Sequence, residues 1–159
     1  RVTNWNLMKN KLEAEEVIKL KLVVDSEKEL LDNKKEAFTY GLAGGMCFDF
    51  NPYQDHLYLV GTEEGKIHLC SKAYSGQYLE TYEGHYLAVY AVKWNTFDPK
   101  VFLSCSADWT IKMWLTDMKA PIVRFDVRCP VGDIQWAPYS STVFAAVTSE
   151  GELKVYDLN

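Results

Sequence analysis

A chain of 159 residues with 48% hydrophobic and 25% charged residues has the composition of a globular protein of one or two domains. Its net charge is −5 at pH 7 and it has no stripe of basic residues, so the sequence offers no general affinity for nucleic acid. No apolar run approaches the roughly 18 residues of a transmembrane helix. We therefore expect no association with a membrane and no secretory leader.

The sequence repeats itself. Phe50, Trp94 and Trp136 mark equivalent points, 44 and then 42 residues apart. A period of about 40–45 residues with four short strands per unit is typical of the WD-type β-propeller blade. The repeat therefore predicts an all-β fold, a WD-repeat β-propeller. Because the chain begins part-way through one unit and stops before the last strand of another, we expect about three and a half blades of a larger ring, which we take to be seven-bladed.

The first 43 residues fit the repeat least well. Residues 1–22 are expected to form the last two strands of a blade, with Trp5 in the third strand and an alternating outer strand over 17–22. Residues 23–43 exceed the length of a repeat and carry many charges of both signs, which predicts an insertion loop on one face of the ring. Two interpretations of the insertion stay open: a solvated loop, or an arm that contacts a partner.

Three more units follow: a blade over 44–83, a blade over 84–127 and an incomplete blade over 128–159. In each unit the innermost strand carries two apolar residues at alternate positions, and the strands that follow are apolar on both faces. Such runs are expected where blades stack on one another. The innermost pairs are Phe48 and Phe50, Val92 and Trp94, and Ile134 and Trp136.

The unit over 84–127 holds residues that could form a buried hydrogen-bond chain. His85 precedes its innermost strand, Asp108 lies in the turn after the second strand, and Trp114 lies in the third strand. This arrangement resembles the WD-repeat signature, in which histidine, a hydroxyl, aspartate and tryptophan lock the blade. A buried indole N–H and a buried imidazole each require a partner, and a carboxylate orients and stabilises the imidazole.

Two serines, Ser104 and Ser106, could supply the hydroxyl. We expect Ser106, because a hydroxyl recurs at its equivalent positions, Thr62 and Thr148, in the flanking units. Serine, histidine and aspartate together also occur in nucleophilic triads. Since no oxyanion-hole loop or nucleophile elbow accompanies them here, we expect a structural role and no catalytic residue.

Other candidate sites are weakly supported. His68 and Cys70 share a strand face, but no second pair at metal-ligand spacing follows, so we expect no metal site. The glycine-rich run 41–45 lacks the Gly-Lys-Ser/Thr ending of a phosphate loop, and nothing else indicates a cofactor. The four cysteines include no Cys-x-x-Cys pair and are expected to be free thiols in a reducing compartment.

Aromatic residues in loops are candidate partner contacts. Trp109 occupies a tight turn in which a small or polar residue would suffice. Tyr53, Phe97 and Tyr139 follow the innermost strands and are therefore expected on the opposite rim. Exposed loop aromatics are plausible anchors of protein interfaces, although they can also fold over a neighbouring blade. Of the four, Trp109 is the strongest candidate.

Several runs resemble the intermediate chains of dynein motors, and their sequences are nearest to those of axonemal outer-arm intermediate chains. These runs are 60–67, 102–110, 131–133 and 136–148. The resemblance implies a noncatalytic scaffold subunit of a ciliary dynein, located in the cytoplasm and on the cilium axoneme, whose propeller docks on the tail of a dynein heavy chain. A second intermediate chain and light chains would bind through regions outside this chain.

Two other functions stay open. A cytoplasmic dynein intermediate chain, or another WD-repeat adaptor that binds peptides or proteins, would have the same fold. The N-terminal region of the full-length protein, or basic and aromatic residues around the central pore, would distinguish these. An enzyme that uses the central channel would require convergent titratable residues, which these units do not supply beyond the hydrogen-bond set.

Overall fold

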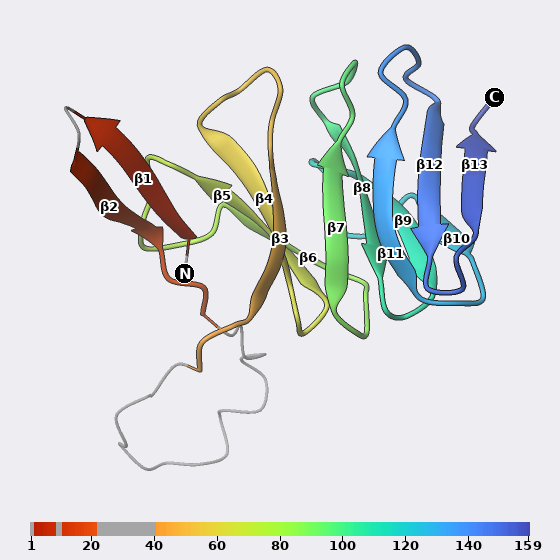
Figure 1. Ribbon diagram of the computed structural model, residues 1–159, viewed down its shortest axis with the longest axis horizontal. Coiled ribbons are helices and arrows are strands. Elements are labelled where there is room, and N and C mark those ends of the chain that lie inside the picture. Colours follow the sequence, from red (N-terminus) through yellow and green to blue (C-terminus); the bar gives the residue numbers. More distant parts are fainter. Residues whose placement is uncertain (1, 9–10, 22–40) are drawn as a thin grey trace.

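The computed structural model describes residues 2–8, 11–21 and 41–159 of the chain. Within these ranges the regular structure is all β, with antiparallel strands grouped into four sheets that stand side by side (Figure 1). The fold class predicted from the repeat is confirmed. Of the insertion expected over 23–43, residues 23–40 lie outside the described residues. In the described part of the chain, no helix is long and apolar enough to cross a membrane.

Two sheets have four strands each, and a third has three, with neighbouring strands following chain order. The first contains β3 (Gly45–Phe50), β4 (Leu57–Thr62), β5 (Lys66–Ser71) and β6 (Glu80–Glu83). The second contains β7 (Val89–Trp94), β8 (Val101–Ser106), β9 (Thr110–Leu115) and β10 (Val123–Asp126). The third contains β11 (Val131–Trp136), β12 (Val143–Thr148) and β13 (Leu153–Asp157). Each sheet is thus one meander, the form that a blade takes in a propeller.

The fourth sheet is the antiparallel pair of β1 (Val2–Met8) and β2 (Lys11–Ile18), in which Met8 pairs with Lys11 and Val2 with Ile18. The outer strand expected over 17–22 is therefore wrong, because the strand that pairs with β1 begins at Lys11 and ends at Ile18. The alternation that suggested it has another cause: Ile18 and Leu20 are both 2% exposed in an apolar cluster with Tyr58. Leu20 lies beyond the strand, and its carbonyl accepts the Ala43 N–H.

The core lies between the sheets. Val92 and Trp94 of β7 are 1% and 3% exposed, in one cluster with Leu59 and Ile67 of the preceding sheet. At the next junction Ile134 and Trp136 of β11 are equally buried, in a cluster with Leu103 and Ile111. The alternate apolar positions of an innermost strand are therefore buried against the preceding sheet, as stacking of blades requires.

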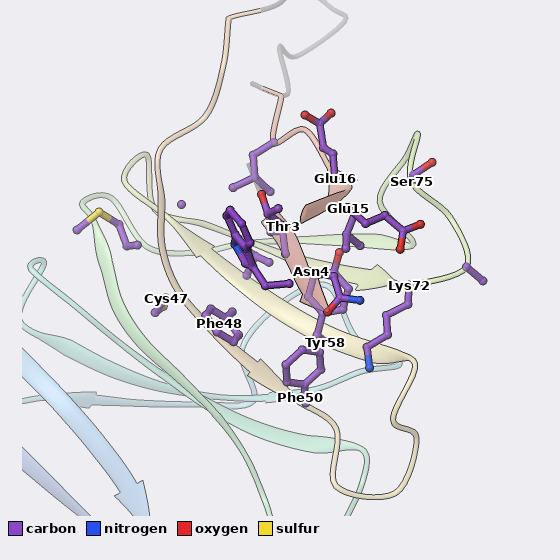
Figure 2. Close-up of a pocket in the computed structure, with 18 residues that line it drawn as sticks. Thr3, Asn4, Glu15, Glu16, Cys47, Phe48, Phe50, Tyr58, Lys72 and Ser75 are labelled. Atoms are coloured by element: carbon purple, nitrogen blue, oxygen red, sulfur yellow. The ribbon is translucent and has the colours of Figure 1, made fainter. Parts of the chain in front are cut away.

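The first innermost strand has a different environment. Phe48 and Phe50 occupy the positions equivalent to Val92 and Trp94, but they remain 60% and 45% exposed. They face the β1–β2 pair across a cavity of about 860 Å3 (Figure 2). A pair of strands covers less of a sheet than the four strands present at the next junction, so the apolar pattern of β3 is only partly buried here.

Hydrogen bonds join neighbouring sheets at one rim. Asn51 Nδ2 donates to the Pro99 carbonyl at 3.0 Å, and Asn95 Nδ2 donates to the Ser141 carbonyl at 2.9 Å, one unit further on. Each asparagine Oδ1 also accepts two backbone N–H groups of its own loop. Both side chains are 4% exposed or less, so each amide fixes a loop and the next sheet together.

Candidate functional site

A buried hydrogen-bond chain runs through the second sheet. Asp108 Oδ2 lies 2.9 Å from His85 Nδ1, and His85 Nε2 lies 2.7 Å from Ser104 Oγ. Trp114 Nε1 donates to the same Ser104 Oγ at 2.8 Å. Because a carboxylate can only accept, a neutral His85 carries its proton on Nδ1, facing Asp108. Its Nε2 then accepts the Ser104 O–H, and Ser104 Oγ in turn accepts the indole N–H. The structure thus brings together three residues of the set expected from the sequence.

The Asp108 carboxylate, at one end of this hydrogen-bond chain, accepts several hydrogen bonds. Besides His85, Asp108 accepts the Thr110 hydroxyl at 2.6 Å and the backbone N–H groups of Tyr86 and Thr110. Burial alone would raise the pKa of Asp108, but these hydrogen bonds outweigh it and hold the pKa well below its usual range. Burial lowers the pKa of His85, against the opposing effect of Asp108. The pair is therefore a neutral imidazole beside an ionised carboxylate.

The expectation that Ser106 supplies the hydroxyl is wrong. Ser106 lies at the end of β8, where its Oγ donates to the Leu87 carbonyl and accepts the Asp108 N–H. The indole of Trp114 lies further from the turn, since Trp114 pairs with Phe102, so the hydroxyl that it reaches belongs to Ser104. The recurring hydroxyl has a different task, which is to fasten the turn after the second strand.

The equivalent threonines of the flanking sheets also bond to the backbone of this turn, but they accept the N–H four residues on, whereas Ser106 accepts the N–H two residues on. Thr62 Oγ1 accepts the Lys66 N–H at 3.2 Å, and Thr148 Oγ1 accepts the Glu152 N–H at 3.2 Å. Residues equivalent to Ser104 are Val60 and Ala146, which have no hydroxyl. The hydrogen-bond chain is thus confined to the sheet that also has the histidine and the tryptophan.

The chain of groups from Ser104 to Asp108 is sealed from solvent. Ser104 is 0% exposed, and the side chains of His85 and Asp108 are 0% and 6% exposed. A nucleophilic serine must reach a substrate carbonyl, and its hydroxyl must be free to lose its proton to the histidine. Here the serine oxygen is buried and holds an indole, so the arrangement supports the blade and offers no reactive group to a substrate.

The weaker sites also have structural explanations. His68 is 1% exposed, stacks on Tyr78 with ring centroids 3.8 Å apart, and hydrogen bonds to Thr81 through Nδ1. Burial raises the pKa of the Cys70 thiol to about 12, which disfavours the thiolate that a metal would bind. Among the described residues no three His, Cys, Asp or Glu side chains are grouped for a metal. In the glycine-rich run, Gly44 bonds to the turn at Glu63 and Glu64.

Trp109 stands on one rim in an unusual backbone conformation. Its φ is 71°, and the equivalent residues of the flanking sheets are Gly65 (φ 87°) and Gly151 (φ 80°). A left-handed conformation suits glycine and strains a residue with a Cβ atom. The Trp109 side chain is nevertheless 53% exposed.

The other three aromatic candidates line the opposite rim, in the loops after β3, β7 and β11, which lie along one edge in Figure 1. They are Tyr53, Phe97 and Tyr139, with exposed fractions of 59%, 49% and 80%. Tyr53 Oη donates to the Thr96 carbonyl at 3.0 Å, so this ring folds over the neighbouring loop. No hydrogen bond from the described residues holds the Tyr139 side chain.

The asparagines that link sheets were missed in the sequence. Asn51 and Asn95 follow Phe50 and Trp94, and their recurrence at the repeat spacing was a usable signal. Asp49 was missed as well: its Oδ2 accepts the Trp94 N–H at 2.8 Å, across the first junction between four-stranded sheets. The signal for Asp49 was weaker, because the equivalent residues are Lys93 and Gln135.

Comparison with known proteins agrees with this geometry. Residues 76–114 match the family described as WD domain, G-beta repeat. The structure is similar to the β-propeller domain of Cps50 (Swd1) from Myceliophteria thermophila, with a TM-score of 0.65 and 19% identity, over 72% of this chain and 34% of that one. This second likeness concerns the fold alone.

Sequence relatives are more specific. The chain is 54% identical over 160 residues to dynein intermediate chain 2, ciliary, of Heliocidaris crassispina, covering 100% of this chain and 22% of the relative. It is 46% identical over 161 residues to the 78 kDa intermediate chain of the flagellar outer arm dynein of Chlamydomonas reinhardtii, covering 99% and 23%. The chain thus spans less than a quarter of the length of these curated relatives. The expected resemblance is confirmed: the chain belongs to the axonemal dynein intermediate chains and corresponds to part of their WD-repeat region.

Proposed function

We propose that this chain is part of a noncatalytic scaffold that docks on the tail of a dynein heavy chain and helps to assemble an axonemal dynein arm. The family places the protein in the cilium or flagellum, on the axoneme. A second intermediate chain and light chains would join through regions of the full-length protein outside these residues. The contribution to motility would be positioning and load transfer, with ATP hydrolysis left to the heavy chain.

The observation that carries this proposal is that the polar side chains able to do chemistry are buried, whereas large aromatic side chains are exposed. Within the described ranges, the serine, histidine and aspartate that could act together are buried and hydrogen bonded. The rims instead display large side chains, of which Trp109 and Tyr139 are 53% and 80% exposed. Buried reactive groups and exposed aromatic side chains suit a protein that binds other proteins.

A rigid scaffold also requires sheets that do not shift against one another. Both junctions between the three larger sheets are closed by buried aromatic side chains, Trp94 at the first and Trp136 at the second. The amides of Asn51 and Asn95 cross the same junctions at the rim. Close packing of this kind transmits force with little deformation, because interiors have low compressibility.

The test is purification of the full-length protein from ciliated cells through an affinity tag, followed by mass spectrometry and quantification of the partners. We expect an axonemal dynein heavy chain in stoichiometric amount, and cross-links from this chain to the heavy-chain tail. Absence of any heavy chain at low ionic strength would contradict the proposal. A tagged full-length version of an unrelated WD-repeat protein from the same cells is the matched control.

A further inference from the structure

The rim that bears Trp109 is built from turns and loops of three successive sheets. It comprises the β4–β5 turn (63–65), the β6–β7 loop (84–88), the β8–β9 turn (107–109), the β10–β11 loop (127–130) and the β12–β13 turn (149–152). We call it the Trp109 rim. It lies at the end of the sheets opposite to the loops of Tyr53, Phe97 and Tyr139, since successive antiparallel strands turn at alternate ends.

Trp109 is not required by the turn that holds it. Gly65 and Gly151 form the same turn in the flanking sheets with similar positive φ, and glycine does so without strain. No hydrogen bond or ring contact from the described residues holds the Trp109 side chain. A strained tryptophan with an exposed, unpartnered indole indicates a role outside the turn, because strain of this kind is concentrated at functional positions.

The neighbouring loop enlarges the apolar surface. Tyr86 and Leu87 are 84% and 53% exposed. Their loop is tied to the turn of Trp109 by the Ala107 N–H, which donates to the Ala88 carbonyl, and by the Tyr86 N–H, which donates to Asp108. The buried hydrogen-bond chain therefore fixes the loop and the turn together. A rigid aromatic patch is the usual centre of a protein interface, because its side chains lose little entropy on binding.

The charges around this patch are mainly negative. The exposed charged residues of the rim segments are Glu63, Glu64, Glu150, Glu152 and Arg128. The buried Lys112 adds one cation, with its Nζ 5.6 Å from the centroid of the Tyr86 ring. Glu63 and Glu64 lie one sheet before Trp109, and Glu150 lies one sheet after it. The patch is thus an apolar centre with carboxylates on both sides, in a chain whose net charge is −5.

The backbone of the rim favours a helical ligand over an added strand. An added strand pairs with free N–H and C=O groups of a sheet edge. On this rim the Gly65 N–H bonds to the Thr62 carbonyl, and the Trp109 carbonyl accepts the Val127 N–H. Because these two groups are already paired, we take recognition to rely on side chains, as it does when an amphipathic helix lies on an apolar surface.

We infer that the Trp109 rim is the docking surface for a cationic amphipathic helix of a partner protein, with its apolar side on Tyr86, Leu87 and Trp109 and its lysines or arginines beside Glu64 and Glu150. This inference rests on the proposed scaffold function, and it names the face of the propeller and the chemistry of the segment that this face accepts.

The direct test is binding of a designed helical peptide of about 18 residues, long enough to fold, with leucine on one face and lysine on the other. Its matched control has glutamate in place of lysine. The full-length protein is compared with Trp109→Gly and Glu150→Gln, and with two variants on the opposite rim. These are Tyr139→Ala and Asp55→Asn, of which Asp55 is exposed in the loop after β3.

We expect the lysine peptide to bind more tightly than the glutamate peptide. Trp109→Gly should weaken binding by at least about tenfold, as for a central aromatic anchor, and should raise the midpoint of urea unfolding because it relieves the strained φ. Glu150→Gln should weaken binding about two- to threefold and reduce its salt dependence. The two variants of the opposite rim should bind as the unchanged protein does.

Equal binding of both peptides, or unchanged affinity of Trp109→Gly, would overturn the inference. Purification of heavy chain with the same variants separates it from the proposed function. Heavy chain retained equally by Trp109→Gly would leave the scaffold function standing and reject this rim as its docking surface. No heavy chain with the unchanged protein would reject the scaffold function, and the peptides alone would then decide whether the rim accepts a cationic helix.

Discussion

At the scale of single residues, the hydroxyl that joins the histidine to the tryptophan shows how a repeat can mislead. A hydroxyl stands at the Ser106 position in each of the three larger sheets, where it bonds to the turn after the second strand. Ser104 has no counterpart, and for that reason it belongs with His85 and Trp114, which have none either. A function present in one blade alone should be sought among residues present in that blade alone.

Replacement of the two serines should therefore have unequal effects. Ser104→Ala leaves His85 Nε2 and Trp114 Nε1 buried without a partner, and we expect the free energy of unfolding to fall by about 1–3 kcal/mol. Ser106→Ala removes turn bonds at the end of a strand and should cost about 1 kcal/mol. Urea unfolding of the full-length protein would measure both. A larger loss of unfolding free energy for Ser106→Ala would indicate that Ser106, and not Ser104, joins His85 to Trp114.

Acid should destabilise the fold through its buried histidines. Burial lowers the pKa of His68 to about 4 and also lowers that of His85. An unfolded histidine titrates near about 6.5, so below that pH the unfolded chain binds protons that the folded chain excludes. Their contribution is complete above about pH 6.5 and is lost as the pH falls towards the folded pKa, at no more than about 1.4 kcal/mol per pH unit for each histidine.

Unfolding by urea at a series of pH values would measure this slope. His68→Gln retains a polar side chain beside Thr81 and should make the slope shallower between about pH 6.5 and 4. The same slope in the variant and the unchanged protein would show that His68 does not contribute. Asp108, whose pKa is held low, should add a further loss only below about pH 4.

At the scale of elements, the loops after the innermost strands both connect strands and link neighbouring sheets. Asn51 and Asn95 accept backbone N–H groups of their own loops and donate to a carbonyl of the next sheet. In the third sheet the equivalent residue is Ala137, which can do neither. The two asparagines thus link three sheets in series, while the aromatic side chains nearby remain on the surface.

Removing one of these amides should loosen one junction. Asn95→Ala leaves the Ser141 carbonyl and two loop N–H groups without their partner, and we expect a loss of about 1–3 kcal/mol. Amide hydrogen exchange should show faster exchange at Phe97 and Asp98, whose N–H groups bond to Asn95. Asn51→Ala, with its own loop affected instead, is the matched control. Uniform acceleration across all sheets would contradict a local link.

At the scale of the whole molecule, the sheet that packs against a given sheet determines whether the apolar residues of that sheet are buried. Val92 and Phe48 occupy equivalent positions, yet their exposed fractions are 1% and 60%. The difference arises because the β1–β2 pair leaves a cavity beside β3 (Figure 2). The described residues of this partial propeller therefore cover only part of the apolar face of β3.

In the full-length protein we expect Phe48 to be as buried as Val92. Phe48→Ala should then cost about 3 kcal/mol or more, the usual effect of removing a buried phenylalanine side chain. An exposed Phe48 would instead give a change within about 0.5 kcal/mol. Urea unfolding of the full-length variant, with the exposed Tyr139→Ala as control, distinguishes the two outcomes.

The sequence by itself determined the fold class, the blade repeat and the family, because these depend on periodic burial and on long runs of matching residues. It also identified His85, Asp108 and Trp114, since buried polar side chains need partners. Only the tertiary structure decided that Ser104 completes this set, that the second strand begins at Lys11, and that Trp109 adopts a strained conformation that glycine adopts elsewhere. These depend on distances and backbone angles set by neighbouring strands and turns, which spacing along the chain does not specify.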